Sequence, residues 1–151
     1  MKGVQLLPLQ FVEDERGWFV EVRRESRLPA QTVQTNVSFS RKGVIRGLHY
    51  HERGQDDLFA CLVGTARVVV LDRESGEVFT TDIGEDNPVA VYVPGHFAHG
   101  FEALTDLVFC YHVTREYDPD DPDEHAVPWD DPRVKHLWST QSPILSERDR
   151  V

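Results

Sequence analysis

Several features that would place this chain in another class of protein are scarce or absent. No apolar run approaches the roughly 20 residues that a membrane-spanning helix needs, and the first residues lack the long apolar core of a secretory signal. Basic residues are outnumbered, with 16 Lys and Arg against 26 Asp and Glu, and the formal net charge of −10 opposes binding to nucleic acid. The sequence therefore predicts a cytoplasmic protein without a membrane or nucleic-acid partner.

Cysteine is rare as well. The only two, Cys61 and Cys110, both lie in apolar runs. Cysteines of this kind in a cytoplasmic protein are usually reduced thiols of the core. We therefore expect no disulfide.

β-branched and aromatic residues, by contrast, recur in short runs along the first 115 residues. Turn signals such as DERG, RESG and PGHF separate these runs at intervals of about ten residues, which is typical of an all-β sandwich or barrel. No sustained helical periodicity interrupts them. The predicted strands lie at 18–23, 31–40, 58–64, 66–72, 89–94 and 107–113.

The character of the sequence changes after Tyr117. The stretch DPDDPDEHAVPWDDP is acidic and broken by prolines, which predicts a surface loop with at most a short helical turn and no strand. The residues that follow contain apolar anchors and should pack back on the body. With 151 residues and no internal repeat, the chain is expected to form a single domain over 1–151.

Two histidines stand one residue apart in RGLHYH, residues 46–51. Alternation along a strand would point His49 and His51 to the same side. Together with Asp57 and His99, this order resembles the two sequence blocks of the cupin barrels, in which such side chains hold a transition metal ion inside a double-sheeted jelly roll. That resemblance implies a metal site made by His49, His51, Asp57 and His99.

A closer resemblance covers nearly the whole chain. Seven motifs occur in order: DERGWFVE at 14–21, QTNVS at 34–38, RGLHY at 46–50, PGHFAHGF at 94–101, Tyr111 with Tyr117, WDDP at 129–132, and PILSERD at 143–149. In these motifs the chain resembles the dTDP-4-dehydrorhamnose 3,5-epimerase family, a metal-independent branch of the cupins. The resemblance implies an isomerase of deoxysugar biosynthesis that needs no cofactor and acts on a nucleotide-linked 4-keto-6-deoxy sugar.

The same resemblance implies an architecture. It predicts an all-β cupin fold, a double-stranded β-helix whose core barrel spans about 30–115, followed by an irregular or helical segment, 116–151, that packs back. It also implies a homodimer in which the strand segment 10–24 is exchanged and contributes to the neighbouring site.

Roles in proton transfer follow from the resemblance too. A ketone at C4 of the sugar makes the protons on C3 and C5 acidic, so a base can remove one and an acid can return it to the opposite face. His49 matches the base, Asp149 the carboxylate that orients its imidazole, and Tyr111 the acid, which is a plausible proton donor if its environment lowers its pKa from the usual value of about 10. The residues expected to bind the nucleotide and sugar are Arg16, Phe19, Glu21, Gln34, Asn36, Arg46, His51, Asp57, His99 and Tyr117.

Three positions depart from the family pattern. Asp57 aligns near a lysine thought to stabilise the enolate oxygen, Val68 aligns near that lysine's aspartate partner, and His51 replaces a small residue or glutamine. A carboxylate would oppose a developing oxyanion. Alternative functions therefore remain open: a metal-dependent cupin enzyme, a catalytically silent sugar-nucleotide binder, or a 3,4-ketoisomerase, since cupin ketoisomerases carry the similar motif RGFHAH.

Overall fold

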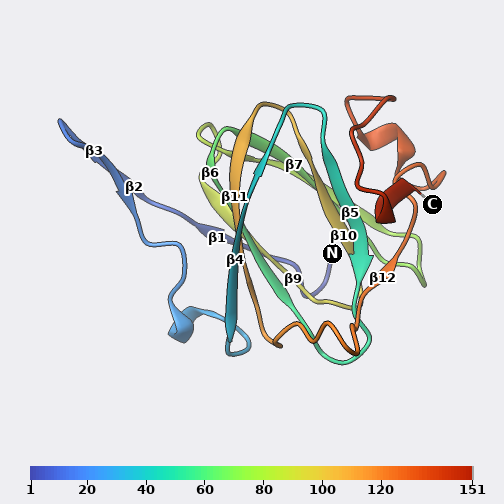
Figure 1. Ribbon diagram of the computed structural model, residues 1–151. Helices are drawn as coiled ribbons and strands as arrows, with labels where there is room; N and C mark the ends of the chain where they lie inside the picture. The colour runs from blue at the N-terminus through green and yellow to red at the C-terminus, as the bar shows by residue number, and fades with distance from the viewer. Residues whose placement is uncertain (151) are drawn as a thin grey trace.

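Two five-stranded antiparallel sheets face each other in the computed structural model, which describes residues 1–150 (Figure 1). The first sheet has the order β1 (Gln5–Pro8), β9 (Val89–Val93), β6 (Asp57–Val63), β11 (Leu107–Val113), β4 (Gln34–Ser40). The second has the order β12 (His125–Ala126), β5 (Ile45–Tyr50), β10 (Ala98–Ala103), β7 (Thr65–Leu71), β8 (Val78–Gly84). This arrangement is the predicted jelly roll.

The remaining elements are short. A separate two-stranded hairpin consists of β2 (Phe11–Asp14) and β3 (Gly17–Val20). Three single-turn 3-10 helices are η1 (Glu25–Arg27), η2 (Lys135–Leu137) and η3 (Arg148–Arg150). No helix among residues 1–150 is long and apolar enough to cross a membrane.

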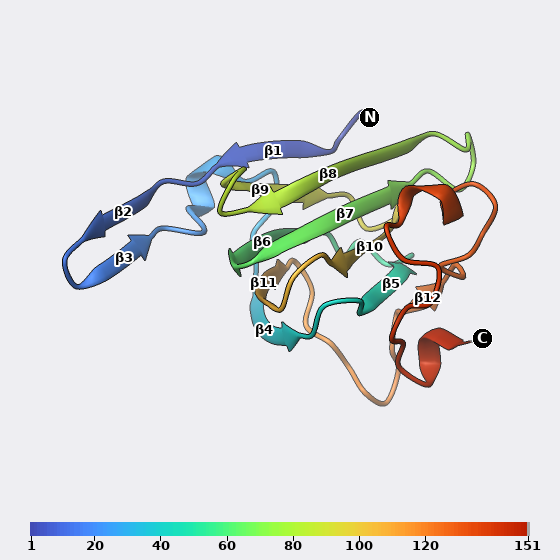
Figure 2. The same cartoon turned by 90° about the horizontal axis from the view of Figure 1, so that it is seen from above.

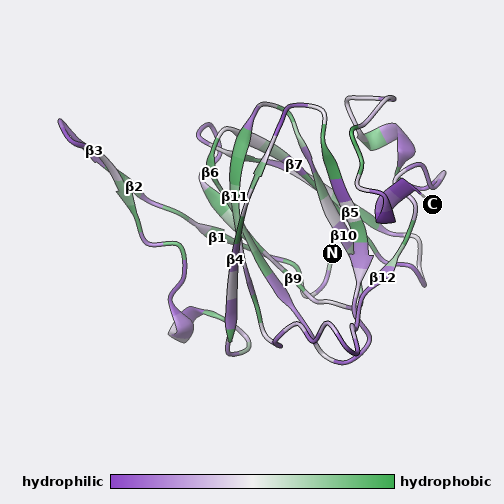
Figure 3. Ribbon diagram, viewed as in Figure 1, coloured by the Kyte–Doolittle hydropathy of each residue, from purple (hydrophilic) through white to green (hydrophobic). Residues whose placement is uncertain are grey.

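Strand β7 shows why the second sheet is covered on both sides. Val68 and Val70 point between the sheets into the main core, whereas Val69 and Leu71 point outward and pack with Val134 and Trp138 of the C-terminal segment. A strand that is apolar on both faces needs a layer on each. Residues of the C-terminal segment supply the outer layer. Figure 3 shows hydrophobic residues on several strands of the two sheets.

Phenylalanines fill part of the space between the sheets. Phe101 on β10 and Phe109 on β11 come from opposite sheets, and their rings stack with centroids 3.9 Å apart. Phe59 on β6 packs edge-on against Phe109 at 5.2 Å. These three rings fill one part of the space between the sheets, and polar side chains project into the other part.

Each of the six predicted runs contains a strand, but one loop prediction is wrong. Within the acidic segment, His125 and Ala126 pair with Tyr50 and His49 as β12. The pairing holds because Val127 is buried and exchanges both backbone hydrogen bonds with Leu48. The buried Val127 beside the edge of β5 therefore stabilises this short strand despite the prolines on either side of it.

The hairpin β2–β3 projects away from the body of the chain (Figure 2). Three of its large apolar side chains, Val12, Trp18 and Phe19, are exposed, and Phe19 is 70% exposed. Exposed large apolar side chains on both faces of a projecting hairpin are unusual for a surface that only faces water.

Candidate active site

A cavity of about 660 Å³ lies between the sheets and is bordered by the loop 115–124 and the residues 144–149. All of the predicted site residues line it except Arg16, Phe19 and Glu21. These three belong to the projecting hairpin and the residue that follows it, so this chain does not bring them to its own cavity. Both histidines of RGLHYH line the cavity, although β5 ends at Tyr50, just before His51.

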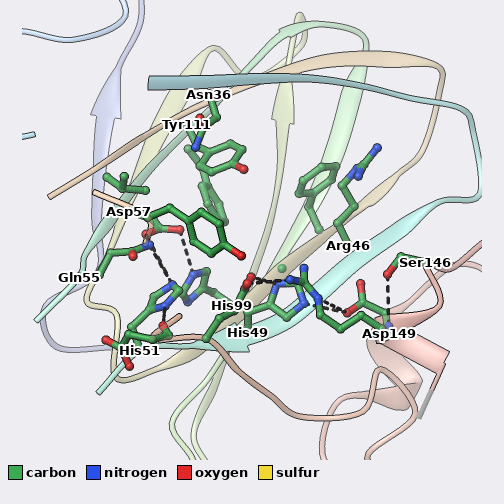
Figure 4. A pocket seen from close by; sticks show the side chains of 18 of the residues that line it. Asn36, Arg46, His49, His51, Gln55, Asp57, His99, Tyr111, Ser146 and Asp149 are labelled. Carbon is green, nitrogen blue, oxygen red and sulfur yellow. Dashed lines mark hydrogen bonds and ion pairs between the residues drawn. The ribbon is translucent and has the colours of Figure 1, made fainter. Parts of the chain in front are cut away.

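His49 and Asp149 form a hydrogen-bonded pair in the cavity wall (Figure 4). The Nε2 atom of His49 lies 2.8 Å from Oδ1 of Asp149, and the backbone N–H of Gly47 donates to Oδ2 at 3.3 Å. A Cβ at Gly47 would lie 2.8 Å from the Cα of Gly100, so glycine allows β5 to lie close to β10 at this position. The strand that carries the histidine thus also helps to fix its partner.

Ionisation of Asp149 is favoured despite its burial. Burial alone raises the pKa of a carboxyl group, but the hydrogen bond and charge of His49, with the Gly47 N–H, hold the pKa of Asp149 below its usual value. An ionised carboxylate can only accept, so the proton lies on Nε2 of His49. Nδ1 is therefore the nitrogen with a lone pair, and it lies 3.6 Å from Oε1 of Glu124.

Tyr111 stands on the facing sheet, on β11, half-buried and paired in register with Asn36. Burial, followed by the charge of Asp57, raises the pKa of its phenol. The environment of Tyr111 therefore does not provide the lowering of the pKa that would make the phenol a readier proton donor. The sequence does not reveal which side chain of β6 lies near a tyrosine of β11, and in this fold it is a carboxylate. The raised pKa keeps the phenol protonated at neutral pH.

A second polar network contains His51, Asp57 and His99, all buried (Figure 4). Nε2 of His99 lies 3.1 Å from Oδ2 of Asp57, and Nε2 of His51 lies 3.9 Å from Oδ1. The Gln55 amide nitrogen is 3.1 Å from Nε2 of His51 and 3.0 Å from Oδ1 of Asp57. Among residues 1–150 this is the one group of three such side chains close enough to share a metal ion, and His49 is not in it. Of the four side chains that the cupin resemblance implies as metal ligands, His51, Asp57 and His99 thus lie close together, and His49 stands apart from them.

The carboxyl group of Asp57 and the imidazole of His99 lie on opposite sheets, and each shifts the pKa of the other. Burial acts against ionisation of both groups, yet the charge of each on the other lowers the pKa of Asp57 and raises that of His99. Burial, and then the charge of His99, lowers the pKa of His51. His51 is therefore the neutral imidazole of the group.

Other predicted residues border the cavity mouth. The guanidinium of Arg46 is exposed and donates to Ser40 Oγ at 2.8 Å and to the Phe39 carbonyl at 3.1 Å. Gln34 donates to Asn36 at 3.1 Å and accepts from the backbone N–H of Tyr117 at 2.9 Å. These contacts tie the loop 115–124 to the edge strand β4.

Sequence reasoning missed several residues of the cavity. Glu124 is one, since it faces Nδ1 of His49 and is held by Arg148 at 2.7 Å. Asp123 is another, because its carbonyl oxygen lies 2.6 Å from Nδ1 of His51. Both stand in the acidic, proline-rich loop, where no periodicity indicates which carboxylate points inward.

Comparison with known proteins decides the family. The family model described as dTDP-4-dehydrorhamnose 3,5-epimerase matches residues 1–151. The chain belongs to this family. The spore coat polysaccharide biosynthesis protein SpsL of Bacillus subtilis is 40% identical over 147 residues, which cover 92% of this chain and 97% of SpsL.

Solved structures of epimerases agree with this fold. NovW of Streptomyces spheroides, a 4-keto-6-deoxy sugar epimerase of novobiocin biosynthesis, is 31% identical with a TM-score of 0.87 over 99% of this chain and 81% of its own. RmlC of Legionella pneumophila, solved with dTDP-4-keto-L-rhamnose, is 28% identical with a TM-score of 0.86 over 99% and 86% of the two chains. The predicted class, a sugar-nucleotide epimerase among the isomerases, is thereby confirmed.

Proposed function

We propose that this epimerase inverts a carbon next to the ketone of a dTDP-linked 4-keto-6-deoxy sugar, with His49 as the base and Tyr111 as the acid. The observation that supports this most is their placement. The base stands on β5 with its carboxylate partner, and the phenol stands on β11 of the facing sheet. A sugar ring between the two sheets would meet the base on one side and the acid on the other.

The proton transfers follow from the geometry. Nδ1 of His49 takes a proton from the carbon beside the ketone, and the electron pair left behind forms an enolate. The resulting imidazolium is stabilised by Asp149 at Nε2 and by Glu124 near Nδ1. The Tyr111 phenol then donates its proton to the other side of that carbon and regains one from water, and the His49 imidazolium releases its extra proton to water.

Nucleotide binding in this proposal requires a second chain. Arg46 borders the cavity, and its guanidinium suits a diphosphate. Arg16, Phe19 and Glu21 lie far from it on the projecting hairpin, so they reach a site only in another copy. We therefore propose a homodimer in which segment 10–24 crosses to the partner, and the exposed Val12, Trp18 and Phe19 support this. We place the enzyme in the cytoplasm, consistent with its two free, buried thiols.

The direct test is solvent deuterium incorporation into a dTDP-linked 4-keto-6-deoxy sugar, followed by NMR. Wild-type protein should place deuterium next to the ketone and form an epimer. His49→Asn should lower that rate on the order of 10²–10⁴-fold, the usual contribution of a general base. His96→Asn, an exposed histidine outside the cavity, is the matched control.

Other results would contradict the proposal in identifiable ways. A product whose ketone has moved to C3 would indicate the ketoisomerase. Tight binding of the sugar nucleotide without any deuterium in it would indicate a silent binder. Exchange at the wild-type rate in His49→Asn would exclude His49 as the base.

A further inference from the structure

The contact between His99 and Asp57 is unusual in its hydrogen bonding. Nδ1 of His99 lies 2.8 Å from the Phe97 carbonyl oxygen, and Nδ1 of His51 lies 2.6 Å from that of Asp123. A carbonyl oxygen only accepts, so both Nδ1 atoms carry hydrogen. In the neutral rings, both Nε2 atoms therefore present lone pairs.

These lone pairs converge on a carboxylate. Nε2 of His99 is 3.1 Å from Oδ2 of Asp57, and the three ligand atoms of His51, Asp57 and His99 all lie within 4.8 Å of one another. Electron-pair donors in this arrangement repel unless a cation lies among them. A proton on Nε2 of His99 satisfies its contact with Asp57, and the Gln55 amide donates to Nε2 of His51 at 3.1 Å, whereas a metal ion can engage all three side chains at once.

We propose that His51, Asp57 and His99 form a binding site for one divalent transition metal ion, such as Zn²⁺ or Co²⁺. Two imidazoles with one carboxylate suit such ions, at ligand distances of about 2.0–2.2 Å. Hydrogen bonds from Nδ1 to backbone carbonyls are the outer-shell support that fixes metal-binding histidines. His51 precedes β6, Asp57 lies on β6 and His99 on β10, so the site connects the two sheets.

Gln55 occupies the edge of this site. Its amide nitrogen donates to Nε2 of His51 and to Oδ1 of Asp57, at 3.1 and 3.0 Å. A metal ion would take over both contacts and release the amide. The Oδ2 side of Asp57, which faces His99, has no such donor.

The site shares its cavity with His49. All three ligands line that cavity, so the remaining coordination positions of the ion would face it. A bound ion would also restore positive charge at Asp57, where the family pattern has a lysine. This last point rests on the proposed function, whereas metal binding does not.

Metal binding is measured on the full chain without any sugar. Purified protein is stripped with a chelator, titrated with Zn²⁺ or Co²⁺, desalted and analysed for metal, and the Co²⁺ form is examined by visible absorption. We expect one equivalent per chain. Asp57→Asn and His51→Gln should each weaken binding by at least about 10-fold, since even outer-shell changes cost that much.

Two histidine variants define the site further. His112→Gln, a buried histidine outside the cavity, controls for general effects of such substitutions and should keep one equivalent. His49→Asn should keep it as well, because the site has three members. Circular dichroism of each variant distinguishes loss of the metal site from loss of the fold. The metal content of the wild-type protein tests the proposal even where a variant does not fold.

Three outcomes would overturn the proposal. Wild-type protein that retains no Zn²⁺ or Co²⁺ would show that a proton alone bridges His99 and Asp57. Loss of metal in His49→Asn would show that His49 is a fourth ligand and that the three-residue site is incomplete. Full retention in Asp57→Asn would place the ion elsewhere. Deuterium incorporation by the stripped protein tests the proposed function separately.

Discussion

Replacing Asp149 by asparagine should damage the enzyme more than replacing it by alanine. The carboxylate accepts from His49 Nε2 at 2.8 Å through one oxygen and from the Gly47 N–H at 3.3 Å through the other. Asparagine has only one acceptor oxygen. If that oxygen keeps the Gly47 contact, the amide NH₂ faces Nε2 of His49 and donates to it.

That donation moves the ring proton to Nδ1, the nitrogen that must accept the substrate proton. Loss of the charge-assisted bond alone is worth about 1.5–3 kcal/mol, or about 10- to 150-fold in rate, which is the loss we expect for Asp149→Ala. Asp149→Asn adds the wrong tautomer, and the same exchange in a Ser-His-Asp triad costs about 10⁴-fold. We therefore expect a loss of about 10³–10⁴-fold for the amide.

The assay is the rate of solvent deuterium incorporation at saturating sugar nucleotide, measured by mass spectrometry. Asp131→Asn is the matched control, because that carboxylate pairs with Arg133 and does not line the cavity. Rates within threefold of wild type for Asp149→Asn, or an alanine variant slower than the asparagine variant, would refute the tautomer argument.

Three further expectations concern the acid, the pair and the hairpin. Tyr111→Phe keeps the ring and removes the proton donor, so NMR should show deuterium exchange with retention of configuration; normal epimerisation would assign the acid to Tyr117 or water. The pKa of Asp149 is lower in the folded than in the unfolded chain, so its ionised form stabilises the fold above the ordinary Asp pKa of about 4, and that contribution is lost as the pH falls. Urea unfolding should therefore show the stability advantage of wild type over Asp149→Asn shrinking below about pH 4, and a constant advantage would contradict the shift. Deletion of residues 1–24 should abolish both dimer and turnover in light scattering and activity assays, and an active monomer would exclude the exchange.

Local pattern predicted the sheets well and the polar interior less well. Short runs rich in β-branched and aromatic residues indicated β4, β6, β7, β9 and β11, because strands that are buried on one or both faces are enriched in such residues. β8, with the sequence VFTTDIG, was missed because its outer face is polar and its apolar content low.

Electrostatic features of the site depend on contacts between distant segments. The family resemblance indicated Asp149 as the partner of His49, yet not which nitrogen it would hold. Glu124 could not be predicted because its loop has no periodic pattern. Burial and then the charge of Asp57 on the neighbouring strand raise the pKa of Tyr111, and the sequence alone does not show that these two residues lie close together.

The stacked pair Phe101 and Phe109 has a consequence for stereochemistry. These rings come from β10 and β11, the strand next to the proposed base and the strand of the proposed acid. The stacked rings separate β10 from β11, so their thickness would limit the width of the space that a bound sugar ring could occupy. Because both rings line the cavity, replacing one of them by a smaller residue would let a bound sugar ring lie closer to one wall. Core residues such as Phe101 and Phe109 would then influence which carbon of the sugar is inverted. Substitutions there could change the product of the enzyme without altering a catalytic group.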